Sequence, residues 1–175
     1  MRLSQASRLA AVLFVTVLTA PAGAADKPSD PQIAHIAYTA GVIDIKTAEL
    51  ALEKSKNDEV RAFANDMVRD HKAVNDNALE LVKKLNVTPE DNDTSKGLVK
   101  QADDKRAELA KLSGAAFDKA YADNEVAYHK TVNGALETLL IPSSSNAELK
   151  SLLETGLKIF KGHEKHAEGM AAKLK

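Results

Sequence analysis

Apolar residues recur at helical spacing through most of the chain that follows residue 30. In segment 57–85, one helix face at about 100° per residue collects Val60, Phe63, Ala64, Met67, Val74, Ala78, Leu81, Val82 and Leu85. A face of the last segment collects Leu149, Leu152, Leu153, Gly156, Phe160, Ala167, Met170, Ala171 and Leu174. Both stripes are typical of amphipathic helices that bury one side.

Start and stop signals divide this pattern into five helices. Ser29 or Asp30 can cap the first helix and Asn57 the second, whereas polar stretches at 86–95 and 141–146 interrupt the pattern. The predicted helices cover residues 31–55, 57–85, 95–111, 115–140 and 147–174. With no candidate strand, the sequence predicts an all-α, up-down-up-down four-helix bundle with a short accessory helix between the second and third long helices.

Composition agrees with a helical core and excludes several kinds of site. Hydrophobic residues make up 44% of the chain but aromatic residues only 4%, so the core depends on Ala, Leu and Val. The absence of cysteine excludes disulfides and thiolate metal sites. The net charge of −1 gives no basis for binding nucleic acid.

The first 24 residues have the order of a secretory signal peptide. Arg2 and Arg8 precede or flank an apolar run at 9–18, and Ala22-Gly23-Ala24 is a small-residue cleavage signal. We therefore expect a signal peptide at 1–24, a polar leader at 25–30 and a bundle domain at 31–175. No later stretch approaches the roughly 20 apolar residues of a membrane span. Export by the general secretory route to the periplasm or the medium is expected.

Each long helix places an ionisable residue on an apolar face, but the first helix is apolar on two sides and only one of them contains Asp44. These residues are Asp44, His71, Glu125 and His163, and His129 follows Glu125 by one turn. Each of the four lies within about four residues, or roughly 6 Å, of its helix midpoint. Because midpoints meet in an antiparallel bundle, we expect one cluster at the waist of the core.

Such a cluster needs compensation, because an isolated buried carboxylate costs several kcal/mol. A divalent Zn, Cu or Fe ion could take Asp44, His71, Glu125, His129 and His163 as ligands. Asp70 and His166 would then contact the ligands without binding the metal themselves, and Asp70 would orient an imidazole. Alternatively, His–carboxylate hydrogen bonds could neutralise the groups without a metal.

The terminal His163-Glu164-Lys165-His166 is one residue short of the His-Glu-x-x-His of zinc proteases. Glu164 and His166 fall on opposite flanks of the apolar stripe, so the three side chains do not converge. The chain also has no phosphate loop and no nucleophile–base set. We therefore expect no catalytic residues and disfavour an enzyme.

Three segments resemble a bacterial family called domain of unknown function 4142. They are "EVRAFANDMVRDHKAVN" (59–75), "FDKAYADNEVAYHKTV" (117–132) and "HEKHA" (163–167). The resemblance implies a ferritin-like bundle of the cell envelope, in a family whose members are often labelled outer-membrane proteins. Peripheral association with the outer membrane is therefore part of the expectation, although the family has no established function.

The resemblance also implies which positions carry the family's polar residues. A first-helix Glu falls on Asp44, an Asp-His pair on Asp70 and His71, and later histidines on His129 and His163. Asp44 is one methylene shorter than the family's Glu. Ferritin-like oxidases use Glu-x-x-His on two helices, which this chain lacks, so a ferroxidase centre is not expected.

Two functions remain open from the sequence. The first is an exported bundle that binds a transition metal through the His/carboxylate cluster. The second is a metal-free structural or stress-protective envelope protein, whose buried polar cluster fixes helix register. Neither function specifies a protein partner.

Overall fold

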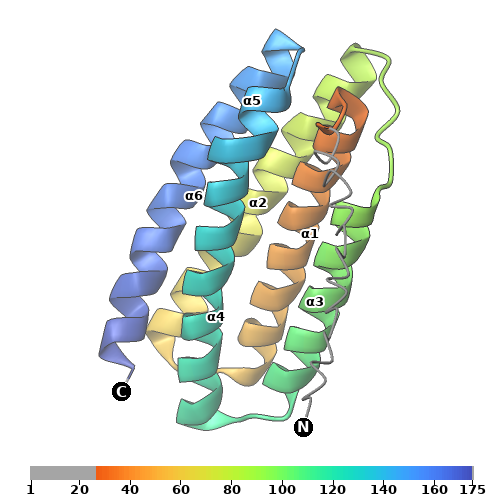
Figure 1. The fold of residues 1–175 in the computed structure, drawn as a ribbon. Helices are drawn as coiled ribbons and strands as arrows, with labels where there is room; N and C mark the ends of the chain where they lie inside the picture. The colour runs from red at the N-terminus through yellow and green to blue at the C-terminus, as the bar shows by residue number, and fades with distance from the viewer. Residues whose placement is uncertain (1–26, 175) are drawn as a thin grey trace, which may run out of the picture.

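The computed structural model describes residues 27–174, and the predicted signal peptide lies outside the described residues. Its long helices are α1 (Asp30–Lys54), α2 (Asp58–Lys84), α4 (Gly114–Ala135) and α6 (Ala147–Lys173). They form the predicted antiparallel four-helix bundle, and α3 (Asp93–Ala110) lies against α1 in the crossover from α2 to α4 (Figure 1). The described residues contain no strand, and none of their helices is long and apolar enough to cross a membrane.

Side-chain caps explain where the helices begin. Ser29 rather than Asp30 caps α1 and forms a capping box with Gln32. Asn57 caps α2, as predicted, by accepting hydrogen bonds from two amides of the first turn. Asp30 instead accepts bonds from Ser145 and Asn146, which ties the start of α1 to the loop before α6.

The third long helix ends differently from the predicted stop at 141. After Ala135 the chain forms a π-helical turn, η1 (Leu136–Leu140), and then the short α5 (Ile141–Ser143). The amide of Ile141 donates to the carbonyl of Leu136, five residues earlier. Pro142 has no N–H to donate, so a regular α-helical ladder could not continue through it, but its fixed φ fits a helical first turn.

The core has two apolar layers with a polar waist between them. One layer surrounds Phe63, Met67 and Tyr121 near the α1–α2 connection. The other surrounds Ile33 and Leu153 near α5. The waist holds buried Asp44, His71, Glu125, His129 and His163. The expected cluster of inward-facing groups at mid-height is therefore present.

Candidate metal centre

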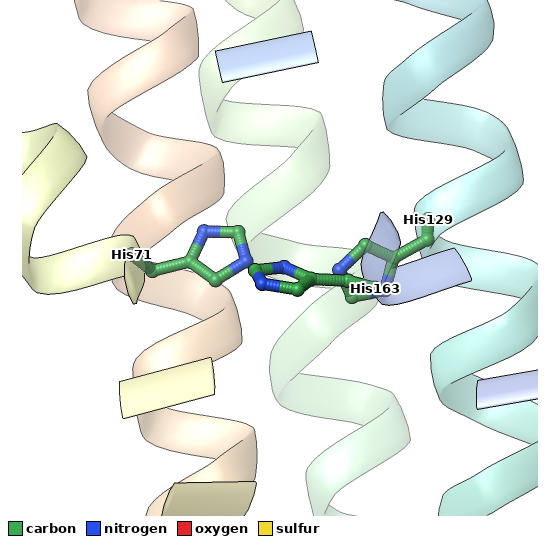
Figure 2. A group of neighbouring side chains, drawn as sticks. All are labelled: His71, His129 and His163. Carbon is green, nitrogen blue, oxygen red and sulfur yellow. The ribbon is translucent and has the colours of Figure 1, made fainter. Parts of the chain in front are cut away.

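Three histidines from three helices converge at the waist. His71 comes from α2, His129 from α4 and His163 from α6, and all three are buried. One ring nitrogen of each lies within 4.8 Å of the others. Figure 2 shows the three rings at one level, pointing toward one another.

Hydrogen bonds outside the cluster orient two of these rings. Nδ1 of His129 lies 3.0 Å from the backbone carbonyl of Glu125, so it carries the proton and leaves Nε2 as the free acceptor. Nε2 of His163 lies 3.0 Å from Asp70, which leaves Nδ1 free. Each of these two imidazoles therefore has one nitrogen anchored and one available, the arrangement that metal-binding histidines use.

Asp70 is itself held in place by an exposed side chain of its own helix. Arg69 donates to its carboxylate at 2.7 Å. The hydrogen bond from Arg69 lowers the pKa of Asp70, and the bond from His163 adds to this effect. Asp70 is therefore a carboxylate at neutral pH, fit to accept the His163 proton. This contact matches the orienting role predicted for Asp70.

Two carboxyl groups complete the cluster from the side of α1 and α4. Oδ2 of Asp44 lies 3.3 Å from Nε2 of His71 and 3.5 Å from Nε2 of His129. Glu125 approaches Nδ1 of His129 at 3.8 Å. Asp44, Glu125 and His129 form a second group with ligand atoms within 4.8 Å of one another. His129 belongs to both groups and links them.

Burial shifts the protonation of the whole cluster toward neutral forms. It raises the pKa of Asp44 to about 8, and burial together with Asp44 raises the pKa of Glu125 well above its usual value. It lowers the pKa of His129 to about 4, that of His71 well below its usual value and that of His163 below its usual value. At neutral pH the imidazoles are thus unprotonated, which is the form that binds metal.

Many polar atoms of the waist lack a hydrogen-bond partner in the described structure. They are both carboxyl oxygens of Asp44, both ring nitrogens of His71, Oε2 of Glu125, Nε2 of His129 and Nδ1 of His163. Buried polar atoms are normally paired, since each unpaired one costs about 1–3 kcal/mol. The donor set of imidazole nitrogens and carboxyl oxygens fits a divalent transition metal.

The other predicted supporting residue, His166, lies elsewhere. Its side chain is exposed and packs edge-on against Phe63, with ring centroids 5.1 Å apart. Position 166 lies about one helical turn, or roughly 4.5 Å, beyond His163 along α6, which places it beside the apolar layer of Phe63 and not at the waist. The structure therefore places Asp70, but not His166, against the cluster.

Sequence reasoning missed the role of Phe160. Its ring stacks on His71 with centroids 4.4 Å apart and an interplanar angle of 9°. Phe160 precedes His163 by three residues on α6, so both share one helix face. That spacing was a usable signal, but the pairing with His71 depends on how α2 and α6 pack.

Solved structures of similar fold support the ferritin-like bundle. The crystal structure of a DUF305 fragment from Deinococcus radiodurans has a TM-score of 0.70 at 12% identity, covering 85% of this chain and 99% of that one. CopM in the Cu(II)-bound form has a TM-score of 0.62 at 16% identity, covering 83% and 98%. No curated protein sequence matches the chain.

The sequence profile of one family matches almost the whole chain, over residues 16–170. This range includes all the residues of the waist and confirms the resemblance seen in the three segments. The chain therefore belongs to the family described as Domain of unknown function (DUF4142).

Proposed function

We propose that this protein binds one divalent transition metal ion at the waist of the bundle. The observation that carries the proposal is the convergence of three buried, unprotonated imidazoles, two of them oriented by hydrogen bonds on their far nitrogens. Ligand atoms on one ion lie at most about 4.2 Å apart, twice a bond of about 2.1 Å. Small side-chain rotations would close the observed separations.

His71, His129 and His163 are the proposed principal ligands, and Asp44 is the proposed fourth. Oδ2 of Asp44 already lies beside two of the three imidazoles. Glu125 would balance charge or serve as a further ligand, because it shares a ligand group with Asp44 and His129. A bound cation would offset the burial of both carboxylates, which are otherwise driven to their protonated forms.

Copper is the first metal to test. Imidazole and carboxylate donors suit zinc, copper and iron, and for a given set of such ligands Cu²⁺ binds most tightly among divalent first-row ions. CopM, a protein of similar fold, has a structure in a Cu(II)-bound form. At 16% identity this likeness speaks for the fold alone, so it guides the choice of probe and does not assign the metal.

We further propose that the protein acts in the cell envelope. Residues 1–24 have the charge, apolar run and cleavage signal of a secretory signal peptide. Mass spectrometry of protein recovered from an osmotic-shock fraction would test this. The expected new N-terminus is Ala25, whereas an intact Met1 in the cytoplasmic fraction would contradict export.

The metal proposal is tested by calorimetric titration of the untagged mature chain, residues 25–175, after chelation. The four long helices and both core layers lie within this range. We expect one Cu²⁺ per chain, and loss of the site when His71, His129 or His163 is replaced by Ala. His166→Ala is the matched control, because that imidazole lies outside the cluster. Equal binding by all four variants would contradict the proposal.

One observation favours a metal-free polar network as the second candidate. With its raised pKa, a protonated Asp44 could donate to Nε2 of either neighbouring histidine without a cation. This role predicts that His71→Leu keeps or raises the melting temperature. It also predicts that added Cu²⁺ or Zn²⁺ changes the melting temperature of neither the parent protein nor the variant. A melting temperature of the parent that climbs with metal concentration, and does not do so in His71→Leu, favours the metal site instead.

A further inference from the structure

The half of the bundle nearest α5 contains a cavity of about 240 Å³ that begins at the waist. Its lining on α2 extends from His71 to Val82. Eleven residues of helix rise by roughly 16 Å, so the cavity is long and narrow and follows the bundle axis. The cavity explains a feature of the predicted apolar stripe. Its members Val74, Ala78 and Val82 line the cavity and are only partly buried.

The cavity wall offers hydrocarbon and almost no free polar group along its length. Its middle is lined by side chains such as Val74, Ala78, Val132 and Leu153. Asn75 and Tyr128 also line it between its two ends, and their polar groups are bonded to the backbone of α1. Asn75 donates to the carbonyl of Tyr38 at 3.4 Å, and the hydroxyl of Tyr128 donates to the carbonyl of Ala40 at 2.7 Å.

The size and shape of the cavity select a kind of occupant. An engineered apolar cavity of about 150 Å³ stays dry and binds benzene, and this one is larger. Its length of roughly 16 Å exceeds what a single ring would fill. A flexible unbranched alkyl chain matches both the narrow section and the apolar wall.

The two ends of the cavity differ in what they would do to a charged headgroup. Leu139, in the turn before α5, and Thr94 line the cavity and are exposed, so they mark its mouth. The inner end is closed by His71 and His129, behind which lie the buried carboxyls of Asp44 and Glu125. A carboxylate head would lose its hydration there and face two acids, whereas at the mouth it stays in water.

We propose that this cavity binds one unbranched alkyl chain, of the class of a medium-chain fatty acid, with its headgroup at the mouth and its methyl end toward His71 and His129. The site goes beyond the proposed metal binding and does not require it. Its test therefore uses the chelated mature chain, residues 25–175, so that failure to bind a metal and failure to bind an alkyl chain are separate results.

The first experiment compares decanoate with decanedioate by calorimetric titration. Both carry the same alkyl length, but the diacid would have to bury a second carboxylate at the waist. We expect one decanoate per chain and binding of decanedioate that is at least about tenfold weaker. Equal affinities, or no saturable binding of decanoate, would overturn the proposal.

The second experiment fills the cavity. Ala78→Leu adds side-chain volume to its wall, and Ala73→Leu makes the same change at an exposed position of the same helix. We expect decanoate to bind about tenfold more weakly to Ala78→Leu, as if about two methylene groups no longer fit, and normally to Ala73→Leu.

A second pair on α4, Ala135→Leu in the wall and Ala127→Leu outside it, repeats the comparison if Ala78→Leu does not fold. Circular dichroism melting establishes that each variant is folded before titration. If the wall variants bind decanoate as well as their exposed controls, the chain binds elsewhere and the assignment of this cavity is wrong.

Discussion

At the scale of single residues, the cluster depends on which ring nitrogen each histidine leaves free. His129 is fixed by a backbone carbonyl of its own helix, a bond that any histidine four residues after a helical residue can make. His163 is fixed by Asp70 of another helix. The first restraint is local and the second is tertiary, so the two respond differently to mutation.

Asp70→Asn should lower metal affinity by about 10–100-fold while leaving the fold intact, because it removes the carboxylate that orients His163. Asp66→Asn is the matched control, since Asp66 also pairs with Arg69 but does not bond to His163. Competition titration with a chromogenic chelator measures both affinities. If the two variants bind alike, Asp70 does not support the metal site.

At the scale of the helices, the ends of α1 and α4 are joined by a buried hydrogen bond. Ser55, the C-cap residue of α1, donates to Asp118 of α4 at 2.5 Å, and both side chains are buried. The same hydroxyl accepts from the amide of Asn57, which caps α2. One serine therefore connects three helices next to the apolar layer around Phe63, Met67 and Tyr121.

Ser55→Ala should destabilise the metal-free protein by about 1–3 kcal/mol, because it leaves the buried Asp118 carboxylate without this donor. Ser151→Ala, at an exposed position of α6, should change stability by no more than about 0.5 kcal/mol. Urea denaturation followed by circular dichroism measures both. A loss at Ser55 no larger than that at Ser151 would show that the bond contributes little.

At the scale of the whole molecule, the polar waist makes stability depend on pH. The pKa of Asp44 is raised to about 8 by burial, so the folded protein keeps a proton that the unfolded chain releases near pH 4. The proton on Asp44 therefore stabilises the folded state at low pH, and this contribution to the free energy of unfolding is lost as the pH rises to about 8. The pKa of His129 is lowered to about 4, so its effect is opposite and is lost as the pH falls below about 6.5.

Of these two groups, only Asp44 makes the free energy of unfolding change with pH between about pH 6.5 and 8. The metal-free protein should therefore lose roughly 1 kcal/mol of stability per pH unit in this window. Asp44→Asn, which cannot ionise, should reduce this slope, and the slope that remains would come from Glu125, whose pKa burial also raises. Urea midpoints measured across the window test this, and an unchanged slope in the variant would mean that Asp44 is not the group responsible.

The helical bundle followed from the sequence because its signals are local. Caps such as Asn57 and the 3.6-residue periodicity of the stripes act within a helix, and the structure begins α2 one residue after that cap. The π-turn at Leu136–Leu140 was not predicted, since apolar spacing does not distinguish it from an α-helical turn.

The sequence by itself determined that the second, third and last long helices each direct an ionisable group inward at mid-height, because helical periodicity sets the direction and residue count sets the height. The first helix is apolar on two sides, so the tertiary structure decided that Asp44 faces the core. Only the tertiary structure decided which atoms meet. It brought Asp70 into a hydrogen bond with His163, stacked Phe160 on His71 and placed His166 beside Phe63. It also opened a cavity on one side of the waist. Distances between helices depend on how all their side chains pack at once, and no single segment encodes them.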